Sequence, residues 1–220
     1  MQRVAAYIDG FNLYHSIDDL NYYFEGGEKI LKEPESRVHY LKWVDLWGLC
    51  NSFVRDYQQL IAVNYYSAYA KWLPEKYARH QAYTSALETR GVRVVMAEFK
   101  ERKRGCKDCG ARWTKHEEKE SDVRLATDLV ADAFLDNFDD AFLITADSDI
   151  KPAIERVRAD TPTKNVVVFA PPKRFSRARD LSPNSEVTKG RIAKYLLPEE
   201  LRDTTGTLIC RMPPKYVLPE

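Results

Sequence analysis

The sequence predicts a three-layer α/β fold, in which helices cover both faces of a mostly parallel central sheet of about five strands. Short apolar runs alternate with segments whose apolar residues recur at helical spacing, which is typical of a doubly wound sheet. The run at residues 141–146 is apolar without alternating, as expected for a strand buried on both faces, and residues 4–9 have the same character. The carboxyl ends of parallel strands share one edge of the sheet, where ligands bind in open α/β folds.

The remaining elements are predicted from apolar spacing and from residues that begin and end helices. Pro74 suits the first turn of a helix and Gly91 suits the position past its end. Residues 21–35 are polar and contain two adjacent glycines, which predicts a loop. In chain order, strands are expected at residues 4–9, 60–70, 92–99, 141–146 and 165–169, and helices at residues 12–20, 36–54, 74–90, 122–137 and 150–159.

Residues 1–180 are predicted to form one domain, from which the strongly charged residues 100–120 make an excursion. Residues 181–220 are predicted to be a C-terminal extension that packs on the same domain. Within it, residues 191–197 fit either a short helix or an edge strand. The proline-rich tail at residues 212–220 fits either a docked or a loose end.

The composition is that of an ordinary globular protein. Hydrophobic residues make up 44% and charged residues 30% of the 220 residues, and the net charge is +1, so any basic surface must be local.

The first residues lead directly into a strand without a signal peptide, and no apolar run approaches the length that spans a membrane. Four cysteines do not make a disulfide framework. A reduced, soluble and cytoplasmic protein is expected, with no membrane partner. The sequence leaves a homodimer open.

Acidic residues follow two of the predicted strands. Asp9 ends the first, and Asp147 and Asp149 come directly after the strand at residues 141–146. Asp122 begins a long helix. Helix capping and the helix dipole are the simpler explanation for each acid alone. One cap leaves the other acid of the pair at 147 and 149 unexplained, however, so a shared anionic site is the favoured interpretation.

Such a group of carboxylates predicts a bound cation. Two carboxylates about 5 Å apart repel each other by roughly 3 kcal/mol at an effective dielectric constant near 20, so one must be protonated or a cation must bind. Oxygen ligands without nearby histidine or cysteine select Mg²⁺ or Mn²⁺ over Zn²⁺. Two such ions can stabilise the attacking water and the leaving oxygen of an in-line displacement. Phosphodiester hydrolysis is therefore the expected reaction.

Three motifs together resemble the NYN family of PIN-like nucleases, of the LabA-like bacterial type. They are YIDGFNLY at residues 7–14, EKESDV at residues 118–123 and LITADSD at residues 143–149, and the resemblance spans about residues 3–180. It implies a PIN-like (Rossmannoid) fold and a metal-dependent endoribonuclease that acts on RNA. By this resemblance, the residues that hold Mg²⁺ or Mn²⁺ and carry catalysis are Asp9, Asp122, Asp147 and Asp149.

The same resemblance implies roles for neighbouring polar residues. Asn12 would orient Asp9 or contact the scissile phosphate, although helix capping explains it equally well. Thr145 and Ser148 would add hydrogen bonds near the ions. Family members usually carry Ser-Gly where this chain has Thr145 and Ala146. Threonine keeps the hydroxyl group, but the alanine adds a Cβ atom where the backbone approaches the ligand.

Two further segments have alternative interpretations. Cys106 and Cys109 form a CxxC motif that is either half of a zinc site or a pair of reduced surface thiols; His116 is a candidate third ligand, and a second chain could complete the site. Lys173 and Arg174 follow the last predicted strand at the carboxyl edge, where they either bind the RNA backbone or form a solvated charged face, which is the simpler explanation for each residue alone. Aromatic residues suited to stacking on unpaired bases are Trp113 and Phe175.

Other functions fit the sequence less well. A non-catalytic RNA-binding or regulatory adaptor that keeps the fold is the main alternative. A receiver domain needs an acid at the end of the third strand, where this chain has Phe99 and Lys100. A haloacid-dehalogenase-type phosphatase needs a second acid two residues after Asp9, where this chain has Phe11.

Overall fold

The computed structural model describes residues 1–107 and 109–217, and its centre is a seven-stranded sheet. The strands follow the order β6-β5-β4-β1-β7-β8-β9, and all neighbours are parallel except β5 and β6. The parallel sheet is as predicted, with two strands more than the expected five. The strands are β1 (Gln2–Asp9), β4 (Gln58–Ala68), β5 (Arg93–Gly105), β6 (Arg112–Lys119), β7 (Asp140–Ile144), β8 (Asn165–Ala170) and β9 (Ser185–Glu186).

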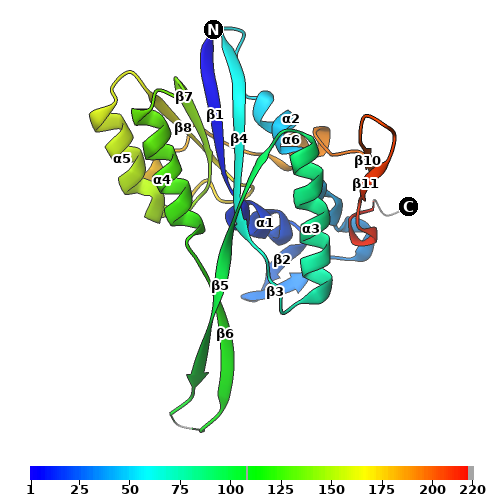
Figure 1. The fold of residues 1–220 in the computed structure, drawn as a ribbon. Coiled ribbons are helices and arrows are strands. Elements are labelled where there is room, and N and C mark those ends of the chain that lie inside the picture. Colours follow the sequence, from blue (N-terminus) through cyan, green and yellow to red (C-terminus); the bar gives the residue numbers. More distant parts are fainter. Residues whose placement is uncertain (108, 218–220) are drawn as a thin grey trace.

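Helices cover both faces of this sheet (Figure 1). On one side lie α4 (Ser121–Phe134) and α5 (Lys151–Asp160). The other side carries α1 (Gly10–Asp19), α2 (Leu46–Asn51), α3 (Pro74–Thr89) and α6 (Lys189–Lys194). None of the helices in the described part of the chain is both long and apolar enough to cross a bilayer.

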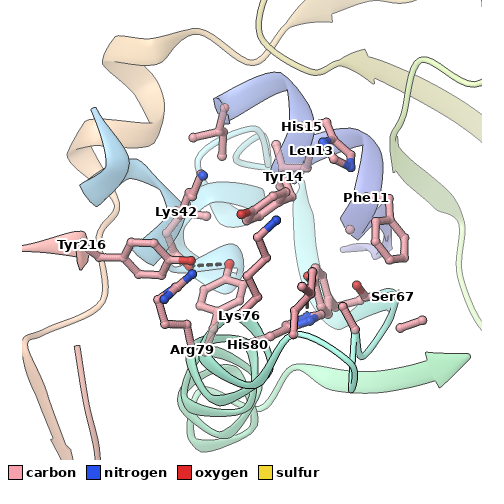
Figure 2. A pocket seen from close by; sticks show the side chains of 18 residues that line it. Phe11, Leu13, Tyr14, His15, Lys42, Ser67, Lys76, Arg79, His80 and Tyr216 are labelled. Atoms are coloured by element: carbon pink, nitrogen blue, oxygen red, sulfur yellow. Dashed lines mark hydrogen bonds between the residues drawn. The ribbon is translucent and has the colours of Figure 1, made fainter. Parts of the chain in front are cut away.

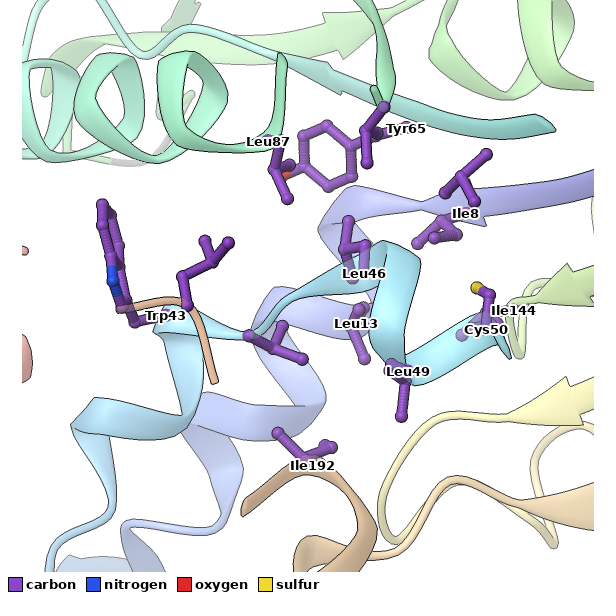
Figure 3. Close-up of a cluster of buried hydrophobic side chains, with 14 of the residues drawn as sticks. Ile8, Leu13, Trp43, Leu46, Leu49, Cys50, Tyr65, Leu87, Ile144 and Ile192 are labelled. Carbon is purple, nitrogen blue, oxygen red and sulfur yellow. The ribbon is translucent and has the colours of Figure 1, made fainter. Parts of the chain in front are cut away.

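Each face of the sheet has its own hydrophobic core, because successive side chains of a strand point to opposite faces. In β1, Ala6 and Ile8 belong to the core beneath α1, α2 and α3, whereas Ala5 and Tyr7 belong to the core beneath α4 and α5. Figure 3 shows the first core, where the buried ring of Trp43 and the side chains around it fill the space between the sheet and its helices. The double burial of these strands explains their unbroken apolar sequence.

Two segments before β4 differ from the predictions. The expected loop at residues 21–35 contains a hairpin of β2 (Tyr22–Glu25) and β3 (Glu28–Leu31). Its turn contains two glycines with positive φ. The expected helix at residues 36–54 is broken into η1 (Pro34–Ser36), η2 (His39–Trp43) and α2. The break falls at Val44, which is extended and forms an antiparallel bridge with Leu196.

The charged excursion at residues 100–120 is mostly an antiparallel hairpin. Strands β5 and β6 pair over eight positions, and Figure 1 shows that they project well beyond the rest of the molecule. Glu117 stabilises the hairpin, because ion pairs of 3.1–3.4 Å surround it on both strands. Hydrogen bonds from Arg104, Lys115 and Lys119 lower the pKa of Glu117 to about 2. Arg102 forms the fourth ion pair.

The C-terminal residues lie against the first core. Residues 191–197 begin in α6, which favours the helical alternative. A second small hairpin, β10 (Glu200–Arg202) and β11 (Leu208–Arg211), precedes η5 (Pro214–Tyr216). Leu201, Met212 and Tyr216 are buried in the core beneath α3. The start of the proline-rich tail is therefore docked, while residues 218–220 lie outside the described residues.

Candidate functional site

The first aspartate of the site is held rigidly at the end of β1. Asp9 is the N-cap of α1, where its Oδ1 accepts a hydrogen bond of 2.9 Å from the backbone N–H of Asn12. Its Oδ2 accepts a 2.8 Å hydrogen bond from the hydroxyl group of Thr145. The residue is only 5% exposed. Burial raises the pKa of Asp9 and the nearby Asp147 raises it further, whereas the bonds from Asn12 and Thr145 lower it.

The second strand end is linked directly to the first. Strands β1 and β7 are neighbours, with Ile8 opposite Ile144, so the residues that follow each strand lie side by side. The backbone N–H of Asp147 donates to Thr145 Oγ1 at 3.0 Å, and the hydroxyl of Thr145 donates to Asp9. One threonine hydroxyl therefore fixes the relative positions of the two strand-end aspartates.

Asp147 also begins the next helical segment. Its Oδ1 accepts a 3.0 Å hydrogen bond from the backbone N–H of Asp149, and η3 (Ser148–Ile150) follows. Ser148 and Asp149 are exposed to solvent. The side chain of Asp149 is thus exposed, whereas the carboxylate of Asp9 is buried.

Asp122 lies in the first turn of α4. Immediately before this helix, Glu120 has a left-handed φ of 84°, and the backbone N–H of Ser121 donates to Glu118 at 2.9 Å. Burial, which is the largest cause, and the charges of the neighbouring acids together raise the pKa of Asp122 to about 7; these acids are Asp9, Glu118, Asp147 and Asp149. Each predicted aspartate therefore lies within electrostatic reach of Asp122, although they come from three separate segments of the chain.

Two further acids of α4 fasten that helix to the sheet. Asp128 accepts a 2.8 Å hydrogen bond from the hydroxyl of Tyr66 and forms an ion pair of 3.0 Å with Arg93. Asp132 accepts a 2.6 Å hydrogen bond from the hydroxyl of Tyr7. These contacts fix the position of α4 on the sheet, with Asp122 near the carboxyl ends of the strands.

The chemistry of these side chains suits a hard divalent cation. Every acid in the group offers carboxylate oxygens, and their mutual repulsion would be relieved by a positive ion. Within residues 1–107 and 109–217, however, no three side chains of His, Cys, Asp or Glu already form a ligand group for a metal ion. The residues therefore fit Mg²⁺ or Mn²⁺ in charge and donor type.

Glu118 is a member of this acidic group that sequence reasoning did not select. It receives the hydrogen bond that starts α4, and its charge contributes to the raised pKa of Asp122. The signal was its place three residues before Ser121, the spacing at which a side-chain oxygen accepts a hydrogen bond from a backbone N–H at the start of a helix.

The predicted basic residues contact acids of the same chain, whereas the predicted aromatic residues are exposed to solvent. Arg174 forms an ion pair with Asp19 at the end of α1, and the backbone of Lys173 donates to Glu186 at 2.8 Å. Trp113 and Phe175 are 51% and 46% exposed. RNA contact by these residues stays a prediction, and Arg174 would have to leave Asp19 to make one.

His116 is too far from the CxxC motif to complete a zinc site there. In the register of the hairpin it pairs with Glu101, four positions from Gly105, a distance of about 13 Å at ~3.3 Å per residue. Its ring stacks on Trp72 with 3.7 Å between centroids, and its Nε2 lies 3.3 Å from Glu101. His116 is therefore wrong as the third ligand of Cys106 and Cys109.

A row of aromatic rings in contact continues from His116 to the start of α1. Trp72 packs edge-on against Phe99 at 4.6 Å, and Phe99 packs against Phe11 at 5.6 Å. Phe11 lies two residues after Asp9. The base of the hairpin and the acidic site are thus joined by one aromatic row.

The fold and the strand-end aspartates define a PIN-like α/β protein. Residues 3–184 match the model of the NYN domain, and the chain belongs to this family. The LabA-like type stays a prediction. A crystal structure of a protein of unknown function from Vibrio parahaemolyticus has a similar fold, with a TM-score of 0.51 and 18% identity over 89% of this chain and 96% of that one. No curated protein matches the sequence.

Proposed function

We propose that this protein is a metal-dependent endoribonuclease that hydrolyses phosphodiester bonds of RNA. Membership of the NYN family suggests a PIN-like nuclease. The observation that carries the more specific proposal is the convergence of Asp9, Asp122, Asp147 and Asp149, whose mutual repulsion contributes to a pKa of about 7 at Asp122. Such a group is costly unless it binds a cation.

The four aspartates would together coordinate Mg²⁺ or Mn²⁺. When bound, such an ion neutralises charge on the scissile phosphate and activates a water molecule. Asp9 is the fixed ligand in this proposal, because two hydrogen bonds and burial hold its carboxylate. Thr145 is a positioning residue, since its hydroxyl holds Asp9 in place and accepts the bond from Asp147.

The hairpin of β5 and β6 is the proposed path for the RNA backbone. Its second strand ends at Lys119, shortly before Asp122, and cations of both strands surround Glu117. Phosphate binding by such a stripe is independent of sequence. The aromatic row from Trp72 through Phe99 to Phe11 offers stacking surfaces between the hairpin and the acids.

Zinc binding at the end of the hairpin is a separate proposal. Cys106 and Cys109 supply two thiolates, and a structural zinc site needs four ligands. The corresponding pair from a second copy of the chain would supply the other two, which would make the protein a homodimer.

A non-catalytic RNA-binding adaptor is the second candidate. It is favoured by the finding that, among the described residues, the acids are not already arranged as a metal-ligand group. The two candidates differ in whether bound RNA is cut.

The test is incubation of the purified protein with single-stranded RNA and with DNA of the same sequence, in Mn²⁺, Mg²⁺ or EDTA. The proposal predicts cleavage of RNA in Mn²⁺ or Mg²⁺ and none in EDTA. Cleavage that persists in EDTA would rule out the metal mechanism, and RNA binding without cleavage under any condition would establish the adaptor.

A further inference from the structure

A cavity of about 210 Å³ lies beside the acidic site, on the face of the sheet covered by α1 and α3. Figure 2 shows side chains from four elements around it: Tyr14 of α1, Lys42 of η2, Lys76 of α3 and Tyr216 of η5. Gly10 and Phe11 form part of its wall, directly after Asp9. None of the four aspartates lines the cavity, so it is a separate site. The first residues of α1 form part of its wall, and Asp9 of the acidic group caps the same helix.

The lining is rich in aromatic rings. Tyr65 and Tyr83 are buried and meet edge-on with 6.0 Å between centroids. Phe11, Tyr14 and Tyr216 approach from other sides. An opening walled by rings on several sides suits a flat aromatic ligand, because stacking and edge contacts both add to burial.

The charged groups of the lining are all basic. Lys42, Lys76 and Arg79 line the cavity, and its lining contains no aspartate or glutamate. Lys42 forms an ion pair with Asp18 outside the cavity, and Arg79 lies 3.6 Å from the exposed Glu75. Lys76 has no ion pair within the described part of the chain. The cavity therefore favours a ligand that brings negative charge.

Neutral hydrogen-bonding groups complete the lining. Burial lowers the pKa of His80 to about 4, so its ring is neutral at pH 7, and its Nε2 lies 3.3 Å from the hydroxyl of Tyr65. The hydroxyl of Ser67 lies in the same wall. Groups that both donate and accept suit the edge of a nucleobase better than a purely apolar ring.

We propose that this cavity binds a nucleotide, with the base among the aromatic rings and the phosphate on Lys76 and Arg79. Two sources share this chemistry: a free mononucleotide, and an unpaired nucleotide of an RNA strand whose backbone continues to the acids. The second source rests on the proposed ribonuclease function, whereas the first does not. An aromatic base has a stacking face whatever its identity, so little preference among the four bases is expected.

The experiment measures binding without catalysis. Nucleoside monophosphates, the corresponding nucleosides, inorganic phosphate and a short single-stranded RNA are titrated into the protein in EDTA by isothermal calorimetry. The proposal predicts that monophosphates or the RNA bind at least tenfold more tightly than nucleosides or phosphate alone. Binding of the RNA but not of monophosphates would assign the site to the substrate strand, and displacement of the RNA by monophosphates would show that both share the cavity.

Two variants locate the binding. Ala70→Trp places an indole at the partly exposed rim of the cavity, and the double substitution Lys76→Ala with Arg79→Ala removes the proposed phosphate contacts. Both should weaken binding at least tenfold. Lys71→Ala is the matched control, since it removes one positive charge from an exposed residue outside the lining. Thermal melting followed by circular dichroism confirms that each variant folds.

The failures of the two proposals are distinguishable. Asp147→Asn should leave nucleotide binding in EDTA unchanged, because Asp147 does not line the cavity. If nucleotides bind but no RNA is cut, the ribonuclease proposal fails alone. If no probe binds, or if Ala70→Trp and the double variant bind as tightly as the wild type, the cavity proposal is overturned even when RNA is cut.

Discussion

Replacing Asp9 or Asp147 by asparagine is expected to reduce Mn²⁺-dependent RNA cleavage by about a thousandfold or more. Asparagine keeps the size of the side chain but removes one negative charge from the group that would hold the ion. A loss of about 4 kcal/mol in stabilisation of the transition state corresponds to this factor. The measurement is the initial rate of cleavage of a labelled RNA at saturating Mn²⁺. Retention of more than a tenth of the wild-type rate in both variants would contradict the proposed roles.

Asp56→Asn is the matched control for these two variants. Asp56 is exposed and lies just before β4, at the amino edge of the parallel sheet and thus opposite the acids. The same chemical change there should leave cleavage within twofold of the wild type. RNA binding in EDTA should be unimpaired in all three variants, because removing a negative charge does not weaken attraction for phosphate.

Gly10→Ala is expected to destabilise the protein by about 2–3 kcal/mol and to remove cleavage. A Cβ atom at this position would lie 2.6 Å from the backbone oxygen of Tyr66 and 2.6 Å from the ring of Tyr65. Both neighbours belong to the central strand β4, so the start of α1 must shift instead. That shift would move Asp9, whose Oδ1 caps the same helix. Urea unfolding and the cleavage assay measure the two effects.

Gly190→Ala separates this steric effect from a general effect of losing a glycine. A Cβ atom at Gly190 meets nothing within 4 Å, and the residue lies in α6 with ordinary helical geometry. Alanine there should leave stability unchanged or raise it by up to about 1 kcal/mol. If Gly10→Ala and Gly190→Ala have equal stability, the close approach of α1 to β4 does not constrain the site.

The parts of the fold nearest the acids were predictable because their signals are local. Each buried strand is a short apolar run, and Asp9 and Asp147 are the residues that end or follow such runs. Parallel pairing of β1 with β7 then brings the two together. The bridging role of Thr145 was foreseen only in outline, because a bond between residues 136 positions apart has no local signal.

The parts that were not predicted depend on distant contacts. The helix expected at residues 36–54 is interrupted because Val44 pairs with Leu196 and the backbone N–H of Asp45 donates to Tyr195. The hairpin of β5 and β6 is held by ion pairs across its strands, which apolar spacing does not report. Arg174 likewise meets Asp19, a partner that lies far away in the sequence.

The central claim is that aspartates from separate segments form one cation site, and direct measurement of Mn²⁺ binding tests it. Electron paramagnetic resonance of Mn²⁺ titrated into the protein, without RNA, reports bound ion independently of activity. The wild type should bind Mn²⁺ with a clear stoichiometry, Asp9→Asn and Asp147→Asn should each weaken binding at least tenfold, and Asp56→Asn should not. Equal Mn²⁺ binding by the wild type and both site variants would contradict the claim.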